Sequence, residues 1–251
     1  MKKHLSLLSL IALSLLLTGC GGIFNFIRTG KTIRASNTLM SETREISGFT
    51  GIDMRTVGRV VISQGETESL ALRGPDNVVP LIETYVRNGV LVIDMEEDIF
   101  VKDLHDSKVL TITIGVKDLS ALTLSGAADV TMDGLTASRL KLEISGAGRI
   151  AFTGLSVDSL SLTLSGAGDV ELEGSADTAV IVISGAGNVQ APDLKIRTAD
   201  VSLPGFGSAT VWVTETLTGS ISGAGNVEYY GNPHTDFKTS GLGVFKSLGS
   251  K

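Results

Sequence analysis

A four-residue turn motif, Ser-Gly-x-Gly, recurs through the second half of the chain and constrains its fold more than any other feature. Consecutive copies start 18, 19 or 20 residues apart. The copies begin at Ser125, Ser145, Ser165, Ser184, Pro204, Ser222 and Ser240, and the copy at Pro204 is degenerate. Self-similarity at such a steady period is typical of a solenoid, in which no single unit can bury its apolar face alone.

The segments on both sides of each turn alternate between apolar and polar residues. Leu160, Leu162 and Leu164 precede one turn, with Ser161 and Thr163 between them. A period of two on both sides of a glycine turn indicates strand-turn-strand, with one set of side chains facing inward. The pattern therefore predicts an all-β fold, a single-stranded parallel β-helix of about 18–20 residues per coil. We expect Leu162 and Leu164 in its core, Ser161 and Thr163 outside, and turn glycines that provide positive φ or close stacking.

The region before the repeats alternates less regularly but belongs to the same pattern. Within it, Thr56-Val57-Gly58-Arg59-Val60 resembles a degenerate first copy of the turn. We interpret residues 45–118 as irregular opening coils with longer insertions, continuous with the regular repeats of residues 119–251. The sequence thus predicts one β-helix domain over residues 45–251.

The N-terminus has the features of a bacterial lipoprotein signal peptide over residues 1–19. Two lysines precede an apolar run from Leu5 to Leu17, which is shorter than the ~20 residues of a bilayer-spanning helix. The run ends in Leu17-Thr18-Gly19-Cys20, which resembles the lipobox, whose cysteine carries a thioether-linked diacylglycerol. These features predict lipidation at Cys20.

The predicted anchor determines the location that we expect for the protein. Cys20 is the only cysteine, so its acylation leaves no thiol for a disulfide. Two or more acyl chains hold a protein stably at a membrane. Residues 20–44 begin with this cysteine, are largely polar, and are expected to form a tether. Because Gly21 rather than an aspartate follows Cys20, we expect an envelope protein at the outer membrane, on its periplasmic or surface face.

The charge balance argues against a nucleic-acid partner. The chain carries 21 Lys and Arg residues against 27 Asp and Glu residues, so its net charge is negative. Two of the lysines lie in the predicted signal peptide, and its cleavage would make the mature chain more acidic. Binding to nucleic acid depends on neutralising phosphates. We therefore expect a partner of another class, a glycan or a protein, besides the membrane itself.

Four stretches of the opening region are informative: the nine residues from Ser41, Val60 to Gly65, Asp76 to Ile82, and Asn88 to Ile93. Together with the turn repeats, these stretches resemble the bacterial GIN-domain family of auto-transporter adhesin heads. The resemblance covers about residues 45–245, and it implies a right-handed β-helix similar in shape to pectin lyases, a role in adhesion and no established catalytic residues. The degenerate fifth turn and Ala128 in the first turn depart from the family's pattern, so the turns are not one uniform site.

The residue types that bind metals or cofactors do not form a recognisable motif. His105 and His234 lie far apart and have no metal-ligand spacing to another His or Cys, so neither zinc nor another cofactor is predicted. The Ser-x-x-Lys motif from Ser138 to Lys141 enters a predicted strand rather than the helix that its catalytic use requires. Calcium is disfavoured because the position after the turn carries Arg149 between Asp129 and Asp169, and a cation site does not tolerate a guanidinium group.

An acidic cluster surrounds three apolar residues, Ile99 to Val101. We favour a solvated insertion between coils. The alternative is a carboxylate pair for glycan cleavage, which needs two acids at a fixed separation. The acidic residues are Asp94, Glu96, Glu97, Asp98, Asp103 and Asp106.

The candidate binding residues are an aromatic pair near the C-terminus. Alignment of the last turns places Trp212 and Tyr230 on the outer face, and their offset of 18 residues equals the local period, so we expect them to stack in adjacent coils. Exposed aromatic residues are enriched at binding hot spots. The equally weighted alternative is that the C-terminal tail, with Phe237 and Phe245, folds back over them.

Three functions remain open from the sequence. The preferred one is a non-enzymatic envelope lipoprotein whose β-helix provides a binding or adhesion surface. The second is a polysaccharide lyase or hydrolase on a pectin-lyase-like β-helix, and the third is a purely structural envelope component. Fold analogy alone is weak support for the enzyme.

Overall fold

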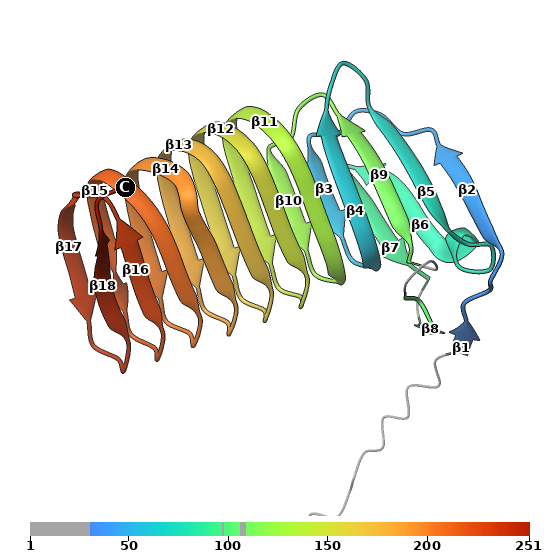
Figure 1. The fold of residues 1–251 in the computed structure, drawn as a ribbon. Coiled ribbons are helices and arrows are strands. Elements are labelled where there is room, and N and C mark those ends of the chain that lie inside the picture. Colours follow the sequence, from blue (N-terminus) through green and yellow to red (C-terminus); the bar gives the residue numbers. More distant parts are fainter. Residues whose placement is uncertain (1–30, 97, 106–108) are drawn as a thin grey trace, which may run out of the picture.

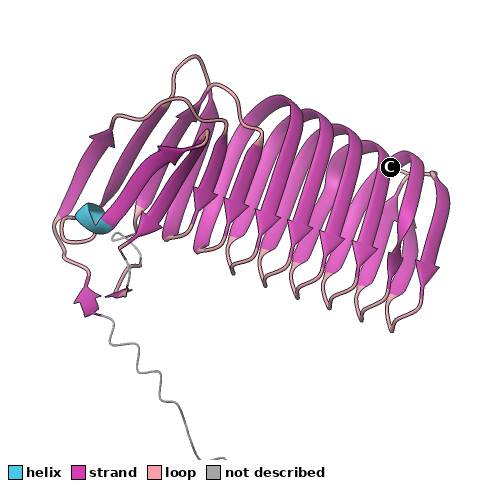
Figure 2. Cartoon of the chain, turned by 180° about the vertical axis from the view of Figure 1, so that it is seen from behind, coloured by secondary structure: helices cyan, strands magenta, loops and turns pink. Residues whose placement is uncertain are grey.

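The computed structural model describes residues 31–96, 98–105 and 109–251, which form a long stack of β-strands (Figure 1). The helical residues within that part are the single short 3₁₀ turn η1 (Val79–Leu81) (Figure 2). The predicted signal peptide, Cys20 and the first ten residues that follow it lie outside the described residues. Within the described part, no helix has the length and hydropathy needed to cross a bilayer.

The second half of the chain is the predicted parallel β-helix. Each long strand runs once around the solenoid and pairs in parallel with its equivalent in the next coil, as with Leu142 and Leu162, which are 20 residues apart. The Gly turns all lie along one edge of the stack (Figure 1). The expected fold is therefore confirmed. Its strands are β10 (Ala121–Leu124), β11 (Ala127–Ile144), β12 (Arg149–Leu164), β13 (Asp169–Ile183), β14 (Asn188–Leu203) and β15 (Ser208–Ile221).

The core is a set of aliphatic columns inside the coils. Leu162 and Leu164 are fully buried, and Leu162 stacks between Leu142 and Ile181 of the neighbouring coils. Ser161 and Thr163 lie on the other face of the strand and are half-buried. The period-two pattern thus separates core from surface as expected.

The turn glycines are required for close approach rather than for unusual φ angles. None of the glycines in the Ser-Gly-x-Gly turns has a positive φ. A Cβ placed on Gly185 would lie 2.0 Å from the carbonyl oxygen of Gly166 in the coil beneath. Stacked turns therefore leave no space for a side chain at this position.

The opening region stacks in an order that differs from the chain order. The coil made of β3 (Gly51–Met54) and β4 (Val57–Gln64) lies directly against β10 and β11. On its other side lies a coil formed later in the chain, made of β7 (Val90–Met95) and β9 (Thr111–Val116). Arg59 aligns with Asp129, as the resemblance of residues 56–60 to a turn suggested. The β3–β4 coil is therefore sandwiched between two later segments.

Antiparallel strands close the N-terminal end of the stack. Strand β6 (Ile82–Arg87) pairs with β7, while β5 (Ser69–Pro75) pairs with β9 and with β2 (Leu39–Arg44). A short separate sheet joins β1 (Lys31–Arg34) to β8 (Ile99–Lys102). The sequence predicts a tether over residues 20–44, but the described part of this stretch contains β1, which pairs with β8, and β2, which pairs with β5.

Aromatic side chains cover the core at the C-terminal end. Strands β16 (Asn226–Tyr230) and β17 (His234–Thr239) form the last complete coil, and β18 (Val244–Gly249) begins a further one by pairing in parallel with β16. The ring of Phe245 stacks on Phe237 at 4.1 Å and on Tyr229 at 4.9 Å between centroids. These rings partly shield the last aliphatic residues from water, as terminal coils of solenoids require.

Candidate binding site

The structure places Trp212 and Tyr230 side by side on the outer face of adjacent coils. Trp212 on β15 is the register partner of Tyr230 on β16, which the 18-residue offset predicts. Val211 and Val213, the chain neighbours of Trp212, are fully buried, so the Trp212 side chain points outward. Both rings are half-buried rather than fully exposed.

Cationic side chains lie over the aromatic pair. The Nζ atom of Lys251 lies 5.2 Å from the Trp212 ring centroid and 5.4 Å from that of Tyr230. Lys195 Nζ approaches the Trp212 ring to 6.0 Å. Lys251 also donates to the carbonyl of Pro192 and pairs with the Asp193 carboxylate. This arrangement combines apolar ring area with fixed charges of both signs, which suits a ligand that has polar groups around an apolar face.

The C-terminal tail contacts this surface through one residue. Phe237 and Phe245 stack toward Tyr229 and the core end, whereas Lys251 reaches the rings of Trp212 and Tyr230. Neither of the two alternatives from the sequence describes the arrangement completely. Phe237 and Phe245 cover the end of the core rather than the aromatic pair, and Lys251 shields the pair in part.

The position that follows each turn forms a ladder of side-chain contacts between coils. Arg149 pairs with Glu171, and Asn188 Nδ2 donates to Asp169 Oδ1 at 3.0 Å. Ser208 Oγ donates to Asn188 Oδ1 at 2.7 Å. Within the described ranges, no group of three or more His, Cys, Asp or Glu side chains is arranged to hold a metal ion. These polar groups are thus engaged with one another along the solvated edge.

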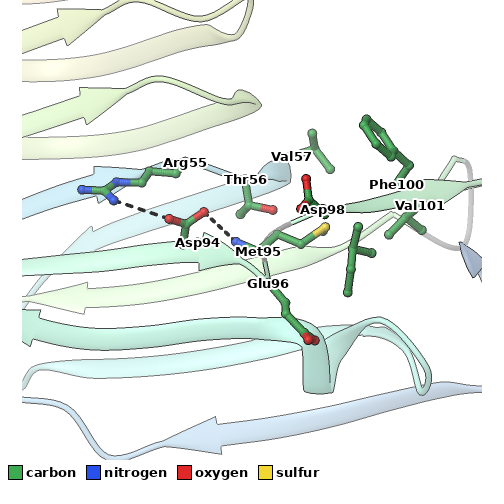
Figure 3. A pocket seen from close by; sticks show the side chains of 10 residues that line it. Arg55, Thr56, Val57, Asp94, Met95, Glu96, Asp98, Phe100 and Val101 are labelled. Atoms are coloured by element: carbon green, nitrogen blue, oxygen red, sulfur yellow. Dashed lines mark hydrogen bonds and ion pairs between the residues drawn. The ribbon is translucent and has the colours of Figure 1, made fainter. Parts of the chain in front are cut away.

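The acidic cluster borders a cavity of about 580 Å³ at the other end of the molecule (Figure 3). Arg55 Nη2 lies 2.6 Å from Asp53 Oδ2, and Arg55 Nη1 lies 3.5 Å from Asp94 Oδ2. The hydrogen bonds that Arg55 donates to Asp53, together with the negative charge of that carboxylate, raise the pKa of Arg55 above its ordinary value. Asp94 Oδ1 also accepts the backbone N–H of Met95 at 2.8 Å. Asp94 is therefore already held by two donors.

The remaining members of the cluster are spread around this region. Glu96 and Asp98 line the cavity, whereas Asp103 Oδ2 pairs with Arg34 Nε at 2.9 Å. Glu97 and Asp106 lie outside the described residues. The cluster is thus partly a cavity wall and partly a surface ion pair.

The other residues that the sequence singled out stand apart from both regions. His234 is exposed on β17, and His105 follows β8 near the opposite end. Ser138 and Lys141 lie on strand β11, where Lys141 Nζ pairs with Glu143 at 2.8 Å. The strand geometry removes the helical spacing on which the Ser-x-x-Lys motif depends.

The comparisons with known proteins agree with this architecture. A family model described as "Putative auto-transporter adhesin, head GIN domain" matches residues 48–233. The chain belongs to this GIN-domain family. No curated protein matches the sequence.

Solved structures resemble the GIN-domain chain over most of its length. A structure from Bacteroides fragilis described as "a putative adhesin" is 30% identical, covers 86% of this chain and 100% of its own, and has a TM-score of 0.82. A "putative adhesin" from Parabacteroides distasonis is 20% identical, covers 87% of this chain and 100% of its own, and has a TM-score of 0.68. A "Putative lipid binding protein" from the same organism has the same identity and coverage with a TM-score of 0.72. The two at 20% identity share the fold.

Sequence reasoning missed the charged partners of the aromatic pair and the contribution of Thr56 to the cavity. Alignment of the coils could have identified Lys195, because it is the register partner of Trp212 in the neighbouring coil. Lys251 and Asp193 are 58 residues apart, and their contact depends on the path of the last residues. Thr56 lies in a degenerate turn, where the sequence gives no sign of a cavity beneath it.

Proposed function

We propose that this GIN-domain protein is a non-enzymatic envelope lipoprotein that binds a glycan or protein ligand through Trp212 and Tyr230. The observation that carries the proposal is the in-register aromatic pair with Lys251 over both rings. Rigid strands hold the rings, so a ligand would not have to order them. The description of the Bacteroides fragilis relative as "a putative adhesin" supports a binding role.

The tryptophan–tyrosine surface has the composition of a binding hot spot. Trp and Tyr carry a large share of the binding energy at protein interfaces and give much contact area for little conformational entropy. Lys195, Lys251 and Asp193 surround the rings and add polar specificity at the rim. A glycan with an apolar ring face, or a protein loop with an acidic or carbonyl-rich tip, fits this chemistry.

We expect Trp212→Ala to abolish retention of a ligand found by screening the protein against a glycan array and against envelope extracts. Truncation removes the larger ring and one of the two cation–π contacts of Lys251. Tyr85→Ala is the matched control, because Tyr85 is an exposed aromatic residue on β6 at the other end of the stack.

Equal retention by the Trp212→Ala variant and the wild type would contradict the proposed site. Cleavage of a bound polysaccharide would point to the lyase or hydrolase alternative. Failure of both screens to give a ligand would favour a purely structural envelope component.

The anchoring part of the proposal rests on Cys20 and the signal peptide before it, which support attachment at the outer membrane. We expect Cys20→Ser to eliminate incorporation of a palmitate analogue in growing bacteria, because the thiol is the acceptor of the lipid. Labelling followed by gel fluorography measures it, with Ser36→Ala as a variant outside the lipobox. Undiminished label in Cys20→Ser would rule out lipidation at this residue.

A further inference from the structure

The cavity of Figure 3 lies where the stack of turns ends. In the β10–β11 coil the turn Ser125–Ala128 joins the two strands, and in the β3–β4 coil residues 55–58 do the same. In the β7–β9 coil beneath, residues 94–110 take the place of the turn, because Ile93 aligns with Met54 and Thr111 with Arg59. That longer connection includes β8, and the cavity lies between residues 55–57 and the described residues 94–96 and 98–101.

At position 56 a threonine stands where the next coil has a glycine of the turn. Thr56 occupies the register position of Gly126, whose added Cβ would lie 2.0 Å from the Thr56 carbonyl oxygen. The glycine is needed wherever a turn lies directly beneath. A side chain fits at position 56 because the space beneath it is the cavity, which Thr56 lines.

The hydroxyl of Thr56 is buried without a partner. The residue is only 3% exposed, and within the described part of the chain its Oγ1 atom makes no hydrogen bond. Figure 3 shows this hydroxyl turned toward Asp98 across the cavity, and away from Arg55. Buried hydroxyl groups are normally satisfied, so an unpaired one that lines a cavity points to a ligand atom that completes it.

The other lining groups indicate the chemistry of that ligand. Glu96 and Asp98 provide carboxylate acceptors on the wall, while Arg55 is already paired with Asp53 and Asp94. An anionic ligand would therefore meet acidic groups and no uncommitted guanidinium. Met95, Ile99 and the half-exposed ring of Phe100 form an apolar wall beside them.

We propose that this cavity binds a small neutral or amino-bearing saccharide. Sugar hydroxyls would donate to Glu96 and Asp98 and pair with Thr56, and the C–H face of the ring would lie against Phe100. The volume of about 580 Å³ falls within the ~300–1,000 Å³ typical of small-molecule sites. The site is independent of Trp212 and Tyr230, which lie at the opposite end of the stack (Figure 1).

Titration calorimetry and saturation-transfer NMR with the full chain test this proposal, with glucosamine, galactose and glucuronate as probes. We expect saturable binding of glucosamine or galactose and at least tenfold weaker binding of glucuronate. Thr56→Val, which keeps the shape and removes the hydroxyl, and Phe100→Ala should each weaken binding about tenfold or more. Thr163→Val, on the outer face of β12, is the matched control and should leave this binding unchanged.

Three outcomes would overturn the assignment: no saturable binding of any probe, stronger binding of glucuronate than of the neutral sugar, or affinities unchanged by Thr56→Val and Phe100→Ala. Thermal melts show whether each variant is folded. If only Thr56→Val were unfolded, Phe100→Ala would decide, since its ring is half-exposed and not part of the core.

Discussion

Replacement of Gly185 by alanine is expected to lower the free energy of unfolding by about 3 kcal/mol or more, the upper end of the cost of overpacking. The new Cβ would lie 2.0 Å from the carbonyl oxygen of Gly166 and 2.6 Å from that of Ser165. Both atoms belong to the backbone of the coil beneath, so the clash can be relieved only by separating two coils. Denaturant unfolding measures the change.

Gly65→Ala is the matched control for this substitution. Gly65 has no heavy atom within 4 Å of its added Cβ and no positive φ, so alanine there should change stability by less than about 0.5 kcal/mol. Similar destabilisation at both positions would show that the effect comes from losing a glycine in general. In that case close stacking of the turns would not be the reason for the repeat.

Leu162→Ala should destabilise the protein by about 2–5 kcal/mol, as truncation of a fully buried leucine does. Leu162 has no exposed surface, and its column neighbours Leu142 and Ile181 belong to separately paired strands. These strands are hydrogen-bonded through both edges, so they cannot collapse easily into the cavity. Midpoints of urea unfolding, with the slope checked for constancy, give the value.

Ser161→Ala is the control on the other face of the same strand. Ser161 is half-buried next to Leu162, and we expect a change within about 0.5 kcal/mol. Equal effects of Leu162→Ala and Ser161→Ala would mean that the inward and outward faces are assigned wrongly.

The regular half of the fold could be predicted because each coil repeats the same local information. The period of 18–20 residues fixes which residues stack, and the period of two fixes which face is inside. Leu142, Leu162 and Ile181 therefore follow from alignment alone, as does the pairing of Trp212 with Tyr230.

The opening region could not be predicted to the same depth, because its pairings are not repeated. Strands β3 and β4 lie between segments that both come later in the chain, and β2, β5 and β6 pair in antiparallel. Alternation of apolar and polar residues identifies such strands but does not determine with which strand each one pairs. For the same reason the cavity beside Thr56 could not be predicted, since it lies where the connection from β7 to β9 is longer than a turn and includes β8.

The candidate binding site was predictable only in its aromatic part. The offset between Trp212 and Tyr230 is a property of the repeat, whereas Lys251 reaches the rings from the last position of the chain. Its pairing with Asp193 depends on how β18 ends. The contacts of Lys251 therefore cannot be inferred from the period of the repeat.

Fluorescence of the single tryptophan tests the proposed binding surface most directly, since Trp212 is the only source of tryptophan emission in the chain. We predict that acrylamide quenches the free protein readily, and that a ligand recovered from the glycan or envelope screen shifts the emission and protects it from acrylamide. A blue emission that acrylamide does not quench, and that stays unchanged when the ligand is added, would show that Trp212 is buried and does not contact the ligand.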